Sequence, residues 1–477
     1  MKTHFSIQQI SFGTLARLCG GELYQGALGE VAVKYICTDS READGQTAFV
    51  ALRGARVDGH DYISAALRQG CRCVICEHRT EELERSDATA IVVNDSELAL
   101  SKLASAYRKY LSCHPIGVTG SVGKTTTKDL IASVLSARHK TYCTPGNHNS
   151  QIGMPLSMLE TPLDSTWSVM EMGMSNFGEV ERLSIAVEPE IAVITNIGSS
   201  HMEALGSREN ICRAKLEILC GLQNGGLLLL NGDEPLLRGI QGKNYRTIYV
   251  SLERKDADFY ATNIRVCPNG TYFDAVWQGH EEKDLFLRVV GRHNVYAALF
   301  AIAIGCRAGL SMEEIRAGLA AYAPRGMRQN IYSVGPYTLI EDCYNASPES
   351  VKAAVDVLES LCRGTQQRSV AVLGDMLDLG PNSPAMHRGV GSHLAQRGID
   401  LLFTLGQGGG QIAVGARQGG MAEDRIHHTP EIESYSQTVE ALLSRVREGD
   451  VILFKASRGV GAERMVAQFK EAFSVES

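Results

Sequence analysis

Residues 119–126 form the octapeptide TGSVGKTT, that is Thr119-Gly120-Ser121-Val122-Gly123-Lys124-Thr125-Thr126. An apolar run before it, Ile116–Thr119, predicts a buried strand, and an amphipathic run after it, Thr127–Ala137, predicts a helix. A glycine loop between a strand and a helix turns backbone N–H groups towards phosphate oxygens, and the helix N-terminus adds positive potential. The octapeptide therefore predicts a nucleotide-phosphate site in an α/β domain.

Two side chains of this loop suit the chemistry of ATP. Lys124 supplies a cation for the β- and γ-phosphates, and the hydroxyl of Thr125 suits Mg²⁺. The general phosphate-loop pattern places its first glycine at position 118, where this chain has Val118. A glycine-rich turn that carries a solvated lysine is the alternative interpretation. We expect ATP to contact Gly120, Ser121, Val122, Gly123, Lys124, Thr125 and Thr126.

Composition and charge describe the whole chain of 477 residues, of which 44% are hydrophobic and 21% charged. These values are typical of a folded enzyme, and the length suggests roughly three domains. A formal net charge of −7 provides no broad attraction to nucleic acid or to an anionic membrane. No secretory leader or membrane-spanning run is found, so we expect a cytoplasmic monomer without a nucleic-acid or membrane partner.

Alternating strand and helix patterns predict three α/β domains. Residues 1–113 predict a small N-terminal domain, and residues 114–328 a central domain whose continuous apolar runs indicate a buried, mostly parallel sheet. Residues 329–477 predict a Rossmann-like C-terminal domain. The expected strands are Val31–Ile36, Ala48–Leu52, Cys73–Cys76, Ala90–Val93, Ile116–Thr119, Trp167–Met172, Ile191–Asn196, Gly226–Asn231, Tyr337–Glu341, Ser369–Leu373, Leu401–Leu405 and Val451–Phe454.

Two other patterns attract attention without indicating a ligand. The glycines at positions 406, 408, 409 and 410 follow an expected strand, but their spacing is too irregular for a dinucleotide fingerprint, and we predict a plain loop. The tightest cysteine cluster is Cys71, Cys73 and Cys76, for which His78 is the nearby candidate as a fourth zinc ligand. The apolar neighbours of these cysteines favour a buried strand with reduced, structural thiols.

Glu171, His201 and Lys215 are further candidates in the central domain. Glu171 and His201 lie at or beyond the ends of expected strands, where open α/β sheets bind their ligands. A carboxylate close to the phosphate loop suits a hard cation. Each residue also has a simpler interpretation: a surface glutamate, a histidine without a ligand, and a solvated lysine on a helix.

Five longer segments resemble the Mur ligase family in order and spacing, as does the shortened loop TGxxGKTT. Within that family the resemblance is to the enzymes that add D-alanyl-D-alanine to a UDP-linked peptidoglycan precursor. The segments are EMGMSNFGEVERL (171–183), EIAVITNIGSSHMEALGSRENICRAKLEIL (190–219), DCYNASPESVKAAVDVL (342–358), VLGDMLDLG (372–380) and KASRG (455–459).

The resemblance implies a metal site. In the family, the lysine that matches Lys215 is carbamylated, which converts a cation into a carboxylate-like Mg²⁺ ligand. The residues that match Glu171 and His201 hold two Mg²⁺ ions, and Thr125 joins them as a ligand. Two dications would neutralise the γ-phosphate under attack and template the acceptor carboxylate.

The resemblance also implies contacts with the substrates. Asn294 would meet the adenine end of ATP, although a helix N-cap role is the alternative. Lys455 and Arg458 follow an expected strand and would hold carboxylates or developing charge, although Ala456 replaces the family's glycine. The implied nucleotide contacts further include the hinge arginine Arg328 and the residues Asp342, Tyr344 and Asn345.

The UDP-linked substrate is expected at the N-terminal domain. Ser40 and Arg41 suit a diphosphate, with a surface turn as the alternative, and Asn147 and Asn149 match a segment that contacts the nucleotide sugar in the family. We expect catalysis to involve Lys124, His201, Lys215, Lys455 and Arg458.

By resemblance, the activity is ATP-dependent formation of an amide bond through an acyl phosphate, in cell-wall precursor synthesis. The substrates would be UDP-N-acetylmuramoyl-tripeptide and D-alanyl-D-alanine. The nearest alternatives are another ligase of the group, either one that adds diaminopimelate or a folylpolyglutamate synthetase. The DNPR motif of the diaminopimelate-adding enzymes is absent from this sequence. A nucleotide-dependent switch that forms no bond is the alternative from another class.

Overall fold

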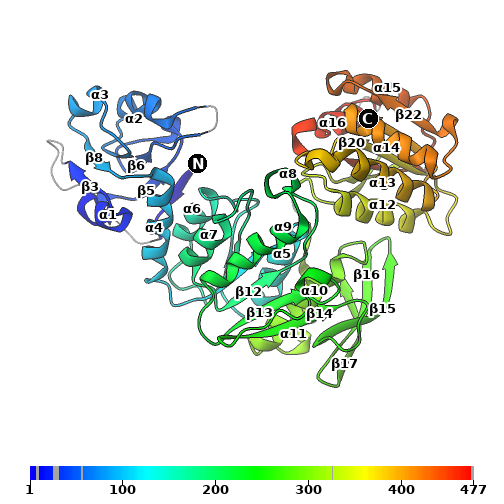
Figure 1. Ribbon diagram of the computed structural model, residues 1–477, viewed down its shortest axis with the longest axis horizontal. Coiled ribbons are helices and arrows are strands. Elements are labelled where there is room, and N and C mark those ends of the chain that lie inside the picture. Colours follow the sequence, from blue (N-terminus) through cyan, green and yellow to red (C-terminus); the bar gives the residue numbers. More distant parts are fainter. Residues whose placement is uncertain (7–9, 25–31, 55–56, 325, 474–477) are drawn as a thin grey trace.

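A computed structural model describes residues 1–6, 10–24, 32–54, 57–324 and 326–473. These residues form three α/β lobes in chain order, each built on one large sheet (Figure 1). The expected architecture of three α/β domains is therefore confirmed. No helix in the described part of the chain is long and apolar enough to cross a membrane.

The N-terminal domain has a six-stranded sheet in the order β1-β5-β6-β7-β8-β3, of which the inner four strands are parallel and the two edge strands antiparallel. The strands are β1 (Lys2–His4), β3 (Glu22–Tyr24), β5 (Tyr35–Cys37), β6 (Thr47–Val50), β7 (Cys73–Cys76) and β8 (Thr89–Val92). A separate pair joins β2 (Ile10–Ser11) and β4 (Ala32–Val33). The helices are α1 (Phe12–Cys19), α2 (Ile63–Arg68), α3 (Glu81–Glu84) and α4 (Ser96–Arg108).

The cysteine cluster of this domain lies in and beside a buried strand, as its apolar neighbours predict. Cys73 and Cys76 lie in β7, and they and Cys71 are buried and unpaired. Burial raises the pKa of all three thiols, so they remain protonated. Among the described residues no group of three or more His, Cys, Asp or Glu side chains is arranged to hold a metal. The expected strand at residues 31–36 starts at Val31, which lies outside the described residues, and its remaining residues divide between β4 and β5, which belong to different sheets.

The central domain has a nine-stranded sheet in the order β10-β11-β9-β12-β13-β14-β15-β16-β17, parallel from β10 to β15. The parallel strands are β9 (His114–Thr119), β10 (Thr141–Cys143), β11 (Trp167–Glu171), β12 (Ile191–Ile194), β13 (Gly226–Asn231), β14 (Tyr245–Ser251) and β15 (Phe259–Cys267). The helices are α5 (Lys124–Ser136), α6 (Gly153–Leu159), α7 (Glu179–Val187), α8 (Met202–Leu205), α9 (Arg208–Leu216), α10 (Asn294–Arg307) and α11 (Met312–Ala321).

Both faces of this sheet are covered by helices. Leu229 packs with α5, α10 and α11 on one face, whereas its neighbours Leu228 and Leu230 pack with α6, α7 and α9 on the other. Because successive side chains of a strand point to opposite faces, a strand buried on both sides must be apolar throughout. The continuous apolar runs of the sequence therefore have a direct structural cause.

An antiparallel ribbon at the edge of this sheet was not expected from the sequence. It consists of β15 with β16 (Gly270–Trp277) and β17 (His280–Leu287). One side of the ribbon faces solvent, so apolar residues alternate with polar and charged ones. This alternation, interrupted by register shifts, makes a weaker strand signal than a continuous apolar run.

The C-terminal domain has a six-stranded sheet in the order β18-β19-β23-β20-β21-β22, in which β18 is antiparallel and the others are parallel. The strands are β18 (Asn330–Val334), β19 (Tyr337–Glu341), β20 (Ser369–Gly374), β21 (Leu401–Leu405), β22 (Ile426–Thr429) and β23 (Val451–Lys455). The helices are α12 (Pro348–Cys362), α13 (Ser383–Gln396) and α14 (Gly406–Gln418) on one face, and α15 (Tyr435–Leu443) and α16 (Glu463–Glu471) on the other.

The glycines at positions 406–410 do not form a loop, so that prediction is wrong. Helix α14 begins at Gly406, directly after β21, and the amide of Gly409 donates a 2.8 Å hydrogen bond to Oδ1 of Asp375. A Cβ atom on Gly406 would lie 2.4 Å from this oxygen, and one on Gly408 would lie 2.3 Å from Nε2 of His387. Close packing therefore requires glycine here and outweighs its low helix propensity.

Candidate active site

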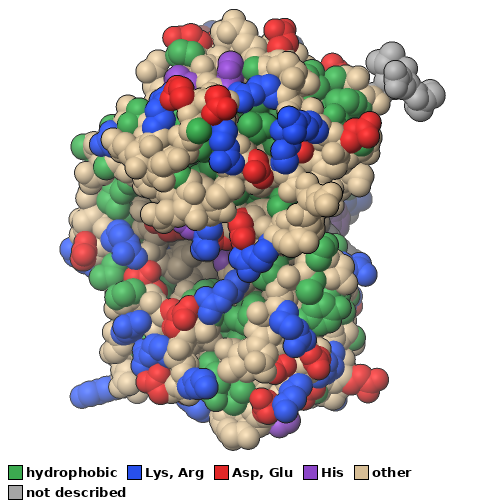
Figure 2. Space-filling model, turned by 90° about the vertical axis from the view of Figure 1, so that its right-hand side faces the viewer, with side chains coloured by type: hydrophobic (Ala, Val, Ile, Leu, Met, Phe, Trp, Pro, Cys, Tyr) green, Lys and Arg blue, Asp and Glu red, His purple; other side chains and the backbone are tan. Residues whose placement is uncertain are grey.

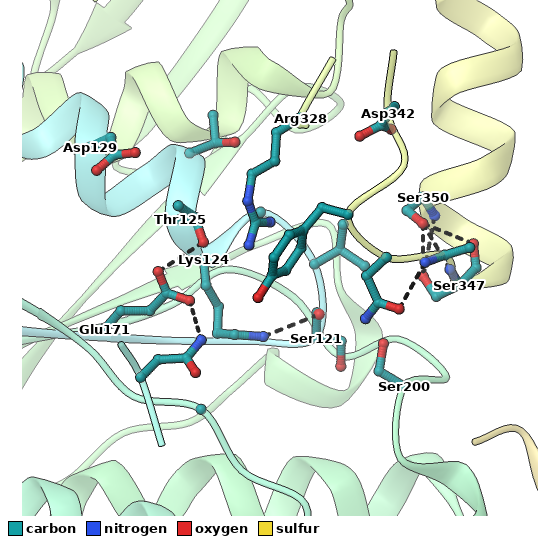
Figure 3. A pocket seen from close by; sticks show the side chains of 18 of the residues that line it. Ser121, Lys124, Thr125, Asp129, Glu171, Ser200, Arg328, Asp342, Ser347 and Ser350 are labelled. Carbon is teal, nitrogen blue, oxygen red and sulfur yellow. Dashed lines mark hydrogen bonds between the residues drawn. The ribbon is translucent and has the colours of Figure 1, made fainter. Parts of the chain in front are cut away.

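A cavity of about 520 Å³ lies where the central and C-terminal domains meet, at the carboxyl ends of the central strands (Figure 3). The phosphate loop and Glu171 line it from the central domain, and Asp342 and Lys455 from the C-terminal domain. Glu97, at the start of α4, also reaches it. Most of the expected site residues therefore surround one cavity.

The phosphate loop is fixed to the strand beside it in the sheet. The amide of Val122 donates to Oδ1 of Asn196 (2.9 Å), and the amide of Ser121 donates to the carbonyl of Asn196 (3.1 Å). Gly120 has a φ of 148°, and a Cβ atom there would lie 1.9 Å from Oγ1 of Thr195. Glycine is therefore required at position 120 by close approach to the end of β12.

Lys124 lies at the first turn of α5 and bends back over the loop. Its ammonium donates to the carbonyls of Gly120 (2.8 Å) and Ser121 (3.3 Å), as Figure 3 shows for Ser121. Burial lowers the pKa of Lys124, and the charge of Glu171 opposes this shift. The solvated-lysine alternative is wrong, because the ammonium is held inside the cavity by the loop itself.

Glu171 ends β11 and is 1% exposed, so the surface-glutamate alternative is wrong. Its carboxylate accepts hydrogen bonds from Oγ1 of Thr125 (2.8 Å) and Nδ2 of Asn149 (2.6 Å). A carboxylate, a hydroxyl and an amide thus converge beside the phosphate loop. Hard oxygen donors of this kind suit Mg²⁺.

Lys128 is fully buried and supports this cluster. Its role was not predicted from the sequence. Lys128 donates to the carbonyl of Thr144 (2.6 Å), pairs with Asp129 (2.9 Å) and lies 4.0 Å from Oε2 of Glu171. It therefore ties α5 to the turn that carries Asn149. Its position four residues after Lys124, on the same helix face, was the available signal.

His201 lines the cavity and precedes α8 with a left-handed φ of 64°. Burial lowers its pKa to about 4, with further lowering by the charges of Lys124 and Lys215. The imidazole is therefore neutral near pH 7, which is the form that coordinates metals.

Lys215 lies in α9 and is 1% exposed, so the solvated-lysine alternative is wrong. It does not line the cavity, but its charge is close enough to lower the pKa of His201. Burial lowers the pKa of Lys215 far below its usual range, with a smaller contribution from Lys124. No hydrogen bond or ion pair between described residues involves its ammonium.

The helix cap alternative for Asn294 is also wrong. His293 occupies the N-cap of α10, and Asn294 is the first helical residue. The side-chain Nδ2 of Asn294 donates to the carbonyl of Val290 (3.0 Å) and to Oε1 of Gln329 (3.2 Å). Gln329, another residue that the sequence did not suggest, donates through its backbone N–H to Oδ1 of Asp342 (3.2 Å). Asn294 and Asp342 are thus connected across the two domains.

Lys455 ends β23 and is 2% exposed. Its ammonium pairs with Oδ2 of Asp342 (2.5 Å) and donates to the carbonyl of Asn345 (2.9 Å). The charge of Lys455 is thus balanced within the C-terminal domain. Its contacts organise the segment that carries Asp342 and Asn345.

Tyr344 lies close to two arginines. The guanidinium of Arg328 is 3.9 Å from the centre of its ring, and that of Arg458 is 5.5 Å away. Both distances fall within the range of cation–π attraction. Arg328 lines the cavity, whereas Arg458 is exposed and lies outside the lining.

Of the residues expected to bind the UDP-linked substrate, one lines the cavity and three lie outside it. Asn149 lines the cavity, whereas Asn147 is exposed outside it. Ser40 is buried, and the side chain of Arg41 is 86% exposed and pairs with Asp39 at 2.6 Å. The structure therefore places Ser40 and Arg41 apart from the cavity, on the N-terminal domain.

A second cavity of about 540 Å³ lies between the central and C-terminal domains, beyond His293 and Ala353. Figure 2 views the molecule from the side of these two domains and shows a hollow between them, bordered by lysine and arginine side chains. The arginines that line this second cavity pair with acidic neighbours, for example Arg363 with Glu359 at 2.7 Å. The carboxylates that line this second cavity, Asp356 and Glu359, are thus paired with arginines.

Three family models match the chain in order. They are described as Mur ligase family, catalytic domain (residues 32–108), Mur ligase middle domain (118–305) and Mur ligase, glutamate ligase domain (327–458). The chain belongs to the Mur ligase family, as its fold and phosphate loop indicate.

Relatives of full length share one name within that family. The chain is 38% identical to UDP-N-acetylmuramoyl-tripeptide–D-alanyl-D-alanine ligase of Bacillus subtilis, over 96% of this chain and 98% of the relative. The enzyme of the same name from Escherichia coli is 30% identical, over 97% and 98%.

Solved structures agree with these relatives. MurF from Acinetobacter baumannii superimposes with a TM-score of 0.87 at 30% identity, covering 97% of this chain and 99% of that one. MurF ligase from Thermotoga maritima in complex with ADP has a TM-score of 0.81 at 27% identity, covering 93% and 98%. A folylpolyglutamate synthase from Mycobacterium tuberculosis, at 16% identity and a TM-score of 0.60, shares the fold.

Proposed function

We propose that this protein is an ATP-dependent ligase that joins D-alanyl-D-alanine to UDP-N-acetylmuramoyl-tripeptide in peptidoglycan precursor synthesis. The observation that carries the proposal is a single cavity formed by the phosphate loop and by the Asp342–Lys455 pair of the next domain, in a chain similar over its full length to ligases of that activity. The ADP complex of the Thermotoga relative supports ATP as the nucleotide.

The reaction has two steps in this proposal. The terminal carboxylate of the tripeptide attacks the γ-phosphate of ATP and forms an acyl phosphate with release of ADP. The amine of D-alanyl-D-alanine then attacks the acyl carbon, and inorganic phosphate leaves as the amide forms. Lys124 and the loop amides hold the phosphates, and the two domains around the cavity exclude water from the acyl phosphate.

Site residues of the C-terminal domain have supporting roles in the same proposal. In the proposal, Asn294 and Arg328 of the central domain contact the nucleotide, together with Asp342, Tyr344 and Asn345 of the C-terminal domain. Lys455 fixes that segment through Asp342, and the exposed Arg458 is available for a substrate carboxylate.

Two Mg²⁺ ions fit the donor set near Glu171. Thr125, Glu171, the neutral His201 and a carbamylated Lys215 would hold them. The ions would neutralise phosphate charge and template the acceptor carboxylate. Lys215 suits carbamylation because the reaction with CO₂ needs a neutral amine, which burial favours.

Thr125→Ala and Glu171→Ala should each raise the Mg²⁺ concentration for half-maximal activity by about tenfold or more. The physical reason is that each variant removes an oxygen from the same site. Mg²⁺ titrations of product formation measure the effect, with Glu181→Ala, an exposed glutamate on α7, as the matched control. Titrations that coincide with the wild type would remove both residues from the metal site.

Arg41→Ala should raise KM for the UDP-linked substrate about tenfold, which is the usual effect of losing one charge-assisted hydrogen bond. KM for D-alanyl-D-alanine should stay nearly unchanged, because Arg41 lies apart from the cavity. The control is Arg85→Ala, whose side chain is 80% exposed on the same domain. Equal increases in KM for both substrates would show that Arg41 does not bind the UDP-linked substrate.

The proposal extends to the setting of the enzyme. UDP-linked precursors and ATP are cytoplasmic metabolites, which supports a cytoplasmic location with reduced cysteines, and we propose a monomer. We place the domain boundaries at residues 113/114 and 328/329, in agreement with the separate sheets.

One assay tests the central claim. Purified protein with ATP, Mg²⁺, UDP-N-acetylmuramoyl-tripeptide and D-alanyl-D-alanine should yield the pentapeptide by mass spectrometry. The alternatives of a diaminopimelate-adding ligase, a folylpolyglutamate synthetase or a nucleotide switch would be favoured by the absence of this product.

A further inference from the structure

One end of the catalytic cavity is formed by the starts of α4 and α7, where the N-terminal and central domains pack together. Glu97, Gln151 and Glu179 line the cavity there, and we call these three residues the acceptor corner. The chemistry of the proposed reaction assigns no task to them.

Gln151 is 8% exposed, and its side-chain oxygen has no hydrogen-bond partner. Its amide nitrogen donates to the carbonyl of Glu179 (3.0 Å), so the amide orientation leaves Oε1 as the free acceptor. Buried acceptors in native proteins are rarely left unpaired, and an exception at a cavity wall indicates a missing donor. The ligand of this corner should therefore carry an N–H or O–H group.

The charges around the corner favour a cation. The carboxylates of Asp95 and Glu179 both act on that of Glu97, and the cation that acts on Glu97 is Arg182, whose Nη1 lies 2.9 Å from Oε1 of Glu97. Burial is the main cause that raises the pKa of Glu97; the charge of Arg182 lowers this pKa, and the two neighbouring acids raise it. A bound ammonium would offset this excess of negative charge.

Resting on the proposed function, we propose that the acceptor corner binds the primary ammonium at the end of the third side chain of the tripeptide. The UDP end of that substrate is assigned to the N-terminal domain, and its reacting carboxylate to the region of Lys124 and Glu171. The acceptor corner shares one cavity with Lys124 and Glu171, and it lies where α4 of the N-terminal domain packs against α6 and α7 of the central domain. Lysine and diaminopimelate both carry the required ammonium, whereas norleucine has a side chain of similar length without it.

The experiment compares kcat/KM for three tripeptides, with lysine, diaminopimelate or norleucine at the third position. The wild type should prefer an ammonium-bearing tripeptide over the norleucine one by about tenfold or more. Glu97→Gln and Gln151→Leu should each reduce this preference about fivefold, through KM for the tripeptide. Gln151→Glu should preserve the preference because it keeps an acceptor at this position, and Glu181→Gln on α7 is the surface control.

Three results would overturn the inference. The first is equal use of the norleucine and lysine tripeptides by an active wild-type enzyme. The second is an equal loss for all three tripeptides in the corner variants, which would indicate a structural role alone. The third is a change confined to KM for D-alanyl-D-alanine, which would assign the corner to the ammonium of the dipeptide. Absence of pentapeptide from every tripeptide would instead overturn the proposed function, and this inference with it.

Discussion

Lys124→Ala is expected to reduce the rate of ATP-dependent ligation on the order of 10³-fold, the usual scale for removing one group that stabilises developing charge. Among the loop residues, Lys124 is the one with a cationic side chain, and its ammonium already lies over the carbonyls of Gly120 and Ser121. The variant would leave the charge that develops on the β- and γ-phosphates without a protein cation in the loop.

The loop itself should survive this substitution. Its anchors are the hydrogen bonds from Ser121 and Val122 to Asn196, and neither involves Lys124. The Tm of the variant should therefore stay close to that of the wild type, which separates loss of chemistry from loss of fold. Lys140→Ala, at an exposed lysine beyond the C-terminal end of α5, is the control. Phosphate release near the wild-type rate would refute the role of Lys124.

Lys215→Ala is expected to reduce the rate of ligation about as much as Lys124→Ala, because a carbamylated Lys215 would be lost as a metal ligand. An unmodified ammonium beside two Mg²⁺ ions would be repelled, so the adduct is the form compatible with metal. Short carboxylic acids that occupy the vacated space should partly restore turnover. Lys215→Arg should stay inactive, since arginine keeps its charge and forms no such adduct.

The modification can also be observed without measuring activity. Protein equilibrated with ¹³C-labelled CO₂ should show a carbamate carbon signal by NMR, and Lys215→Ala should lack it. The signal should strengthen as pH rises through the lowered pKa of Lys215, because the neutral amine is the reactive form. Normal turnover by Lys215→Arg, or an unmodified amine in a high-resolution structure with substrates bound, would return Lys215 to a structural role.

The sequence was most informative where local pattern and burial agree. Strands β7, β13, β19 and β21 have the residue bounds that their apolar runs predict. Each is largely buried, so most residues of each run are apolar, and the polar exceptions are Asn231, Thr338, Glu341 and Thr404. The phosphate loop was equally clear, because its glycines, its lysine and the helix after it follow from backbone geometry within eight residues.

The remaining features depend on contacts between residues distant in the chain. Helix α14 starts with glycines because Asp375 and His387 approach its backbone, although glycine by itself favours a loop. Lys215 is a polar residue on a helix in the sequence, and the packing of α9 against the central sheet buries it. Lys128, Gln329 and Gln151 likewise acquire their partners, or lack them, through the tertiary structure. Local sequence sets backbone preference and hydrophobic period, whereas long-range packing sets the burial and charge of each side chain, and the chemistry of this site depends on burial and charge.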